Sequence, residues 1–335
     1  MDQLSATLDR GWDLAQRGDA MGAVACARRA LEMDPGSPEV HNLLGYSAAL
    51  AGDTDEAVEH YRQALALDES YFEAMLNCAE LLVHPLEEWD DAITLCDQAL
   101  DITETKAEVV DCTLIKVDAL IGKREIELAR RTLATVSDGP FENASHPLMI
   151  GRVYYELGDF DVARPLLEEA IRRDEHLADA HYYLGVLREE AGDARGAVES
   201  FLRARALDAQ IAPPTWAPGP DVLGPMVQRA VAGIDALLAR HVRQAEVFVV
   251  DLPGAELVAD GVDPRSIAIV LEMPGADLDT DLDRPACARL FVYQRNLERA
   301  AGAPERLEEE IRHAIEHEVA NVFGAADPVD KLQLN

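Results

Sequence analysis

The stretch GDAMGAVACARRALEMDP, residues 18–35, returns as GDTDEAVEHYRQALALDE at 52–69, GDFDVARPLLEEAIRRDE at 158–175 and GDARGAVESFLRARALDA at 192–209. Gly18 and Gly52 are 34 residues apart, as are Gly158 and Gly192, and this is the period of a helix-turn-helix repeat. We expect each Gly-Asp pair to close a turn between two helices, and the recurring alanines to lie where paired helices approach closely. The first two thirds of the chain are therefore predicted to form a helical solenoid.

Two weaker copies fill residues 72–138. The first keeps the alanines but replaces Gly-Asp by the longer turn HPLEEW, and the second keeps little beyond Ala129. Together the six copies resemble the tetratricopeptide repeat (TPR) family, and they share with it a small residue in the first helix, such as Gly45 or Gly185, and the terminal Pro35. The resemblance predicts about six repeats over residues 1–210.

A solenoid of this family presents a concave groove that normally binds a peptide or a helix. The family register places these residues in the groove: Trp12, Asn42, Tyr46, Arg152, Tyr155, Tyr182, Glu189 and Glu190. The clamp by which chaperone-binding members hold a C-terminal carboxylate is not matched, because its places carry Asn42, Leu43, Trp12 and Tyr46. An acidic, aromatic groove suits a protein or peptide with basic and apolar anchors. The alternative is a solvated acidic face with tyrosines packed between helices.

Composition narrows the class of partner. The chain has 335 residues with 30 Lys plus Arg against 63 Asp plus Glu, a net charge of −33, which disfavours nucleic acid and anionic membranes. An acidic surface also serves solubility in salt, so a saline host is a second explanation of the charge. The five cysteines form no C-x-x-C pair, and the N-terminus lacks the features of a secretory signal. We therefore expect a cytoplasmic protein.

A segment rich in proline and glycine, residues 211–224, separates the repeats from a chain of different character. It is predicted to be a linker that cannot continue a helix. Residues 225–335 are predicted to form a small α+β domain. Its expected elements are a helix over 226–242, strands over 245–252, 266–273 and 288–295, and a closing helix over 304–324.

The closing helix carries a candidate site. On a helical wheel, one apolar face is formed by Leu307, Ile311, Ala314, Ile315 and Val322, and Glu318 is expected in the middle of that face. A carboxylate there lies either at the floor of a pocket or against a buried partner. His317-Glu318 is the first half of H-E-x-x-H, in which two histidines bind zinc and the glutamate activates water. The place of the second histidine is taken by Asn321.

The strand, the acidic spacer and this helix resemble the minimal zincin-like metallopeptidase family of small bacterial proteins, whose helix reads H-E-x-x-H-x-x-G-x-x-D. The resemblance implies that His317 is a zinc ligand, Glu318 the general base, Gly324 the turn and Asp327 the third ligand. Asn321 breaks the pattern, because an amide oxygen is a poor zinc ligand. An alternative site one turn earlier uses His313 and His317 in the inverted motif H-x-x-E-H.

The sequence thus predicts a mainly α protein, a TPR α-solenoid followed by a small α+β zincin-like domain. Its predicted function is that of a protein interaction scaffold, in which the groove binds a partner and the zincin-like domain has lost catalysis and holds no cofactor. The strand ARLFVYQR is expected to accept an extended peptide by β-addition. The alternative is an active zinc peptidase whose repeats recruit the substrate. Self-assembly through the repeats is a third possibility, which no sequence feature favours.

Overall fold

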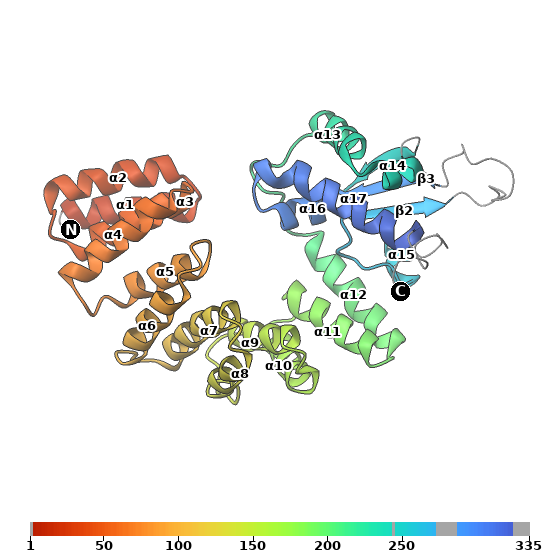
Figure 1. Cartoon of the computed structure of the whole chain (residues 1–335). Coiled ribbons are helices and arrows are strands. Elements are labelled where there is room, and N and C mark those ends of the chain that lie inside the picture. The colour runs from red at the N-terminus through yellow and green to blue at the C-terminus, as the bar shows by residue number, and fades with distance from the viewer. Residues whose placement is uncertain (1–2, 243–244, 273–286, 324–335) are drawn as a thin grey trace, which may run out of the picture. The chain divides into compact units, whose positions relative to one another are not determined.

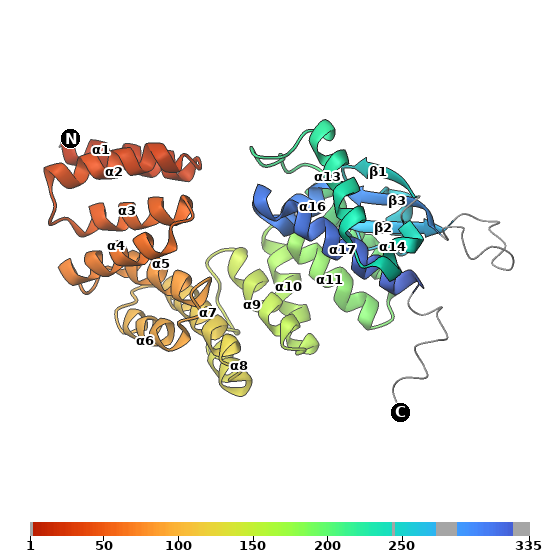
Figure 2. The ribbon, with the colours of Figure 1, turned by 45° about the horizontal axis from the view of Figure 1, so that its top comes forward.

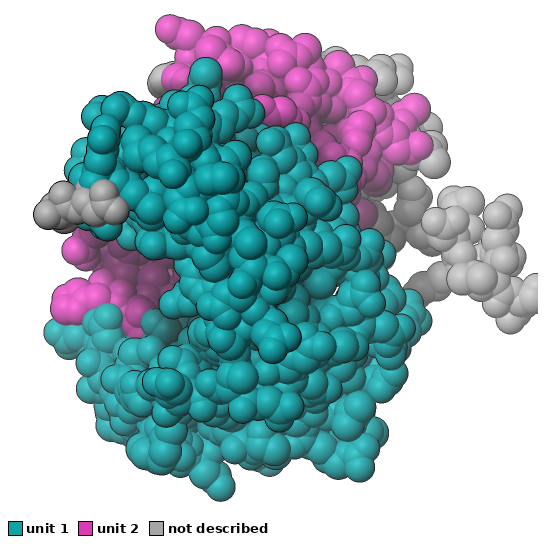
Figure 3. All heavy atoms as spheres, turned by 90° about the vertical axis from the view of Figure 1, so that its left-hand side faces the viewer, with its two compact units in different colours: residues 1–175 teal, residues 176–335 magenta. Residues whose placement is uncertain are grey.

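The computed structural model describes residues 3–242, 245–272 and 287–323 of the chain (Figure 1). The chain divides into two compact units, residues 1–175 and residues 176–335 (Figure 3). In the described segments, no helix combines the length and the apolar character that crossing a membrane requires.

The first unit is a succession of antiparallel helix pairs (Figure 2). Its helices are α1 (Gln3–Gln16), α2 (Ala20–Met33), α3 (Pro38–Leu50), α4 (Thr54–Leu67), α5 (Phe72–Val83), α6 (Trp89–Leu100), α7 (Lys106–Gly122), α8 (Ile126–Ala134), α9 (Ser145–Glu156) and α10 (Phe160–Arg173). A sixth pair, α11 (Ala178–Glu190) with α12 (Ala194–Asp208), belongs to the second unit. The six helix pairs predicted from the repeats are present.

The Gly-Asp turns work as the sequence predicts. Gly52 has a φ of +84°, a left-handed conformation that glycine adopts without steric cost and that ends the preceding helix. Asp53 then caps the next helix, because its side chain accepts a hydrogen bond of 3.1 Å from the backbone N–H of Glu56. In the third copy Asp159 makes no such bond, and its Oδ2 lies 2.8 Å from Nε of Arg130 instead.

The small residues of the first helices let paired helices pack closely. A Cβ added at Gly45 would lie 2.6 Å from Cε1 of Tyr61, whose side chain is fully buried. In the last pair, a Cβ added at Gly185 would likewise lie 2.6 Å from the ring of Phe201. Alanines from the second helices, such as Ala57 and Ala204, are fully buried in the same interfaces.

The second unit adds a three-stranded sheet and its covering helices to the last repeat pair. The elements are α13 (Pro220–Gly233), α14 (Ala236–Val242), β1 (Glu246–Val250), α15 (Ala255–Ala259), β2 (Ala268–Glu272), β3 (Cys287–Tyr293), α16 (Gln294–Ala301), a 3-10 turn (Pro304–Arg306) and α17 (Leu307–Phe323). The strand order is β1-β3-β2, with β1 parallel and β2 antiparallel to β3. One face of the sheet, which includes Leu290 and Val292, forms a core with α13, α14 and α17.

Several elements differ from the sequence prediction. The helix expected over 226–242 is broken between Gly233 and Ala236, and its first half begins earlier, at Pro220, inside the segment predicted to be a linker. Proline is tolerated there because the first residue of a helix has no partner for its N–H. The third strand ends at Tyr293, where α16 begins, and neither α15 nor α16 was predicted.

The last repeat pair packs directly on α15. Val258 of α15 is fully buried in a cluster with Ala197 and Phe201 of α12. Arg205 of α12 also donates a hydrogen bond to the backbone carbonyl of Pro253, just before α15. A short helix of the C-terminal region therefore packs on α12, and the last repeat pair belongs to the same compact unit as that region.

Candidate functional site

Helix α17 packs on the sheet through an apolar stripe. Leu307, Ile311, Ile315 and Val319 are buried, with an exposed fraction of 1% at Leu307 and 0% at the other three. Glu318 lies one turn after Ala314 and one turn before Val322, which both pack against the same core, and it is half-buried. Val319, which the wheel interpretation left out, extends the buried line of residues four apart.

The carboxylate of Glu318 has a backbone partner on β2. Its Oε1 accepts a hydrogen bond of 3.3 Å from the N–H of Val270, a residue that is 5% exposed. Tyr293 donates its backbone N–H to the carbonyl of Ile267, so the backbone N–H and C=O groups of Ile267 point toward β3. Those of Val270, three residues later, point away from β3. Glu318 therefore binds the outer edge of the sheet, which agrees with the expectation of a buried partner.

Tyr293 lies buried near this carboxylate. Its side chain is 1% exposed, and its hydroxyl has no hydrogen-bond partner among the described residues. Burial raises the pKa of the Tyr293 hydroxyl, and the charge of Glu318 raises it further. The hydroxyl therefore stays protonated over the physiological range, as a neutral group beside the carboxylate.

His317 and Asn321, the residues at the two histidine places of the motif, lie on the exposed side of α17. Asn321 follows His317 by one turn, and its Nδ2 lies 3.1 Å from Nδ1 of the imidazole. His313 is also exposed, one turn earlier. Gly324 and Asp327 lie outside the described residues.

The expectation that ARLFVYQR accepts an added strand is wrong. These residues form most of β3, which is the central strand and is paired on both sides. A continuous apolar run does not distinguish a central strand from an edge strand. The strands that end the described sheet are β1 and β2, and on β2 the N–H of Val270 is already bound by Glu318.

In the first unit, the predicted groove residues of the first pairs contact one another. The rings of Trp12 and Tyr46 are 5.4 Å apart at an angle of 59°, and both are half-buried. Asn42 is 2% exposed; its Nδ2 donates to the hydroxyl of Tyr71 at 3.3 Å, and its Oδ1 accepts from Nδ2 of Asn77 at 3.0 Å. Asn42 is therefore a structural link between helix pairs, and the aromatic pair is the part that faces solvent.

The later groove positions of this unit carry a charge and a second aromatic pair. Arg152 is exposed and forms an ion pair of 3.1 Å with Glu156. Tyr155 stacks on Phe160 with ring centroids 5.6 Å apart. Burial raises the pKa of the nearby Asp118 carboxyl, and the charge of Arg152 partly opposes this shift.

In the second unit, the predicted groove residue Tyr182 is already covered. The guanidinium of Arg265 lies 4.3 Å from the centre of its ring, and its hydroxyl donates a 3.1 Å hydrogen bond to Asp263. Arg265 also pairs with Asp179 of the same helix. Glu189 and Glu190, at the end of α11, are exposed.

Sequence reasoning missed the charge cluster beside Tyr182. Asp208 is 4% exposed, and its carboxylate accepts hydrogen bonds from Arg265, at 3.3 Å, and from both terminal nitrogens of Arg299. Burial by itself lowers the pKa of Arg299, but the hydrogen bond to Asp208 and its charge outweigh burial and raise it. The only sequence signal was an acidic residue at the end of a repeat helix, where the copies at 34, 68 and 174 also have aspartate.

Models of known protein families match both parts of the chain. One model described as a tetratricopeptide repeat matches residues 8–72 and 148–211, and a second matches residues 48–111. A model described as a zincin-like metallopeptidase matches residues 242–334. The chain carries TPR repeats and a zincin-like metallopeptidase domain.

Two solved structures are similar to the chain in fold. The first is PilW, a widely conserved type IV pilus biogenesis factor; it is 20% identical, with 63% of this chain and 96% of that chain covered and a TM-score of 0.54. The second is Pseudomonas aeruginosa pilF, with 19% identity, 62% and 93% coverage and a TM-score of 0.52. At these identities the likeness concerns the fold alone. No curated protein matches the chain.

The zincin-like domain poses the question of zinc. Over the ranges 3–242, 245–272 and 287–323, no three His, Cys, Asp or Glu side chains are grouped so that they hold a metal ion. His317 has an imidazole where the family motif needs one, but one turn later the amide of Asn321 faces it. Catalytic zinc sites use three protein ligands, usually with two histidines in this motif. Of the three ligand places of the motif, the described residues thus include one imidazole, His317, and the amide of Asn321, while Asp327 lies outside them.

Proposed function

We propose that the protein is a scaffold whose TPR repeats bind a partner protein or peptide, and whose zincin-like domain no longer catalyses hydrolysis. The binding proposal rests on the half-buried ring pair of Trp12 and Tyr46, which lie on the first helices of consecutive pairs. Aromatic rings that are partly open to solvent provide large, rigid contact areas and are enriched at interfaces.

The chemistry of the partner is suggested by a contact inside the chain. Arg265 covers the ring of Tyr182 and pairs with Asp179 on the same helix. An arginine is thus held by an aromatic face and a carboxylate of an inner repeat helix. We propose that the partner likewise offers basic and apolar anchors to the repeats, as the net charge of −33 favours.

The loss of catalysis is proposed from the contacts on α17. Asn321 stands where the motif has its second histidine, and Glu318, the expected base, accepts a hydrogen bond from the strand backbone. A general base must reach a water molecule that a metal activates, and an amide is a poorer zinc ligand than the imidazole that the motif has at this place.

Binding to a peptide library tests the scaffold proposal. The library holds peptides that combine Lys or Arg with aromatic residues, next to matched sets with Glu in place of the basic residues. We expect selection of the basic set, and a loss of about tenfold or more in affinity with Tyr46→Ala, as for an interface aromatic that contributes over about 1.4 kcal/mol. Met21→Ala is the control, because Met21 is 86% exposed on a second helix. Equal binding of both sets, or by both variants, contradicts the proposal.

An active zinc peptidase is the second candidate, and the family match over residues 242–334 favours it. It requires stoichiometric metal and a hydrolytic activity that Glu318→Gln abolishes. The scaffold requires neither, and its peptide binding is unchanged by a chelator.

A further inference from the structure

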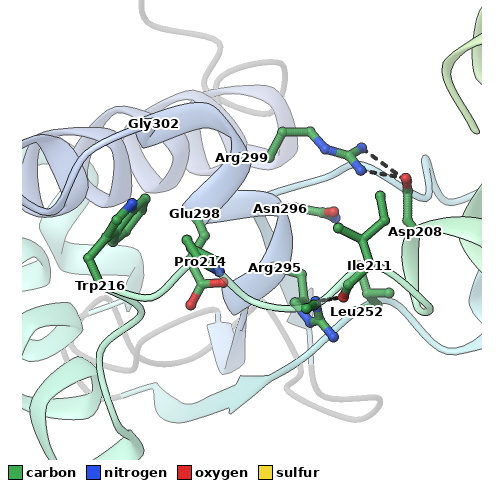
Figure 4. A pocket seen from close by; sticks show the side chains of 11 residues that line it. Asp208, Ile211, Pro214, Trp216, Leu252, Arg295, Asn296, Glu298, Arg299 and Gly302 are labelled. Atoms are coloured by element: carbon green, nitrogen blue, oxygen red, sulfur yellow. Dashed lines mark hydrogen bonds and ion pairs between the residues drawn. The ribbon is translucent and has the colours of Figure 1, made fainter. Parts of the chain in front are cut away.

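A cavity of about 390 Å³ lies in the second unit, apart from both α17 and the predicted groove (Figure 4). It is lined by the end of α12, the segment that follows it, the residue Leu252 after β1, and one side of α16. Its walls combine apolar side chains, among them Trp216 and Leu252, with four charged ones.

Glu298 of α16 is the unusual member of this set. Glu298 is only 4% exposed, and its Oε1 accepts a 2.7 Å hydrogen bond from Nε2 of Gln294. Oε2 is buried and has no hydrogen-bond partner in the described part of the structure. A buried acceptor without a partner destabilises the fold unless a ligand supplies a donor.

Arg295 lies three residues before Glu298, on the same side of α16. Opposite charges at this spacing usually pair, yet no ion pair joins these two within the described residues. The guanidinium of Arg295 donates to the carbonyl of Ile211, and Glu298 is held by Gln294. In Figure 4 the side chains of both project from α16 into the same region. The two charges are therefore held apart by separate partners.

The remaining two charges of the lining neutralise each other. Arg299 donates two hydrogen bonds to Asp208 and points away from the other two charges in Figure 4. The cavity is thus lined by one positive group with free donors, Arg295, and by one acidic side chain, Glu298, whose buried Oε2 has no partner in the described part of the structure. A guanidinium has five N–H donors, so the bond to Ile211 leaves Arg295 able to bind a carboxylate.

We propose that this cavity binds a free α-amino acid with an apolar side chain. The ammonium group donates to Oε2 of Glu298, the carboxylate accepts from Arg295, and the side chain packs against Trp216 and Leu252. Because Oε2 is covered by its neighbours, the ammonium group reaches it after a rotation of the carboxylate about its last torsion, whose energy profile is broad. The ligand is a zwitterion, because the site's two available charges are opposite.

Isothermal titration calorimetry of the full chain tests the proposal with three probes of similar shape. L-Leucine has both charges, L-leucinamide lacks the carboxylate and 4-methylpentanoate lacks the ammonium group. We expect L-leucine to bind, and each analogue to bind about 10- to 100-fold more weakly, the equivalent of one charged hydrogen bond. L-Phenylalanine in place of L-leucine extends the test to a larger apolar side chain.

Two variants locate the binding. Glu298→Gln is expected to weaken the binding of L-leucine by about 10- to 100-fold. Arg295→Gln is expected to weaken the binding of L-leucine but to leave the affinity for L-leucinamide unchanged. Glu309→Gln, an exposed acid on α17 away from the cavity, is the matched control and leaves all affinities unchanged. The Arg295 comparison stays informative if Glu298→Gln fails to fold.

Three outcomes overturn the proposal. One is the absence of binding of either amino acid at about 10 mM, above the dissociation constants of weak specific complexes. Another is equal affinity for L-leucine and L-leucinamide. The third is loss of binding by Glu309→Gln to the same degree as by Glu298→Gln. None of these outcomes bears on the repeats, so the scaffold proposal is tested separately.

Discussion

The first and last pairs of the repeat array have similar inner surfaces in different situations. In the first pairs, Trp12 and Tyr46 contact each other and remain partly open to solvent. In the last pair, Tyr182 is covered by Arg265 of the zincin-like domain, and Asp208 binds two arginines of that domain. The same kind of repeat surface is thus partly open to solvent in the first pairs and is bound by the zincin-like domain in the last pair.

The largest effect is expected from removing the charge that anchors the attached domain. Asp208→Ala leaves Arg265 and Arg299 without their shared buried partner, which lowers the free energy of unfolding of the second unit by about 3 kcal/mol. Asp179→Ala is the control, because the Asp179 side chain is 57% exposed and its pair with Arg265 contributes about 1 kcal/mol or less.

Urea denaturation followed by circular dichroism measures both variants, and hydrogen exchange locates the loss in residues 176–335. If Asp208→Ala and Asp179→Ala have the same effect, the last pair is not anchored as the structure indicates.

The second prediction asks whether both ends of the array depend on the same close packing. Gly45→Ala and Gly185→Ala each place a Cβ about 2.6 Å from a buried ring, so each is expected to lower the free energy of unfolding by about 2 kcal/mol. Gly233→Ala is the matched control. Gly233 is the last residue of α13, it is not followed by proline, and no atom lies inside 4 Å of the added Cβ, so the substitution is expected to stabilise by about 0.5–1 kcal/mol. Thermal unfolding of the three variants shows whether the signs differ.

The third prediction concerns the aspartates that follow the turn glycines. Asp53→Ala removes a helix cap and costs about 1 kcal/mol, with faster hydrogen exchange in the first turn of α4. Asp159→Ala removes an ion pair with Arg130 and no cap, so exchange in the first turn of α10 stays the same. Faster exchange there in Asp159→Ala contradicts the assignment of different roles to the two residues.

The smallest effect is a pH dependence in the first unit. Burial lowers the pKa of His60 below 6.5, and the charge of His41 lowers it further. The unfolded chain therefore binds the proton more readily than the folded one. The stability present above pH 6.5 is lost as the pH falls through that value toward the folded pKa. His60→Gln is expected to flatten the dependence of stability on pH between about 5 and 7.5, as urea denaturation at several pH values shows. An unchanged slope contradicts it.

The repeats were predictable because their information is local. In four copies the Gly-Asp turn and the alanines lie within 34 residues, so that periodicity predicts these helix pairs, and the space between them fits two weaker copies. Asp159 shows the limit of this reasoning. Its sequence context matches that of Asp53, but Arg130, a residue of the preceding pair, takes its side chain away from the cap position.

The contacts of the second unit were not predictable in the same way. Asp208 binds residues that lie 57 and 91 positions further along the chain, and Glu318 binds a backbone group 48 positions earlier. Neither partner leaves a periodic signal. The motif around His317 identified the helix that carries the family resemblance, but the backbone partner of Glu318 depended on the strand that this helix covers.

The most direct test of the account is the zinc content of the full chain, purified without chelators or a metal-binding tag and measured by elemental analysis. The native chain and the variants Asn321→His and His317→Ala are compared. The account predicts that the native chain holds no stoichiometric zinc and that Asn321→His, which restores the second imidazole of the motif, acquires about one zinc per chain. Stoichiometric zinc in the native chain that is lost in His317→Ala would contradict the account and identify the domain as a zinc-binding peptidase candidate.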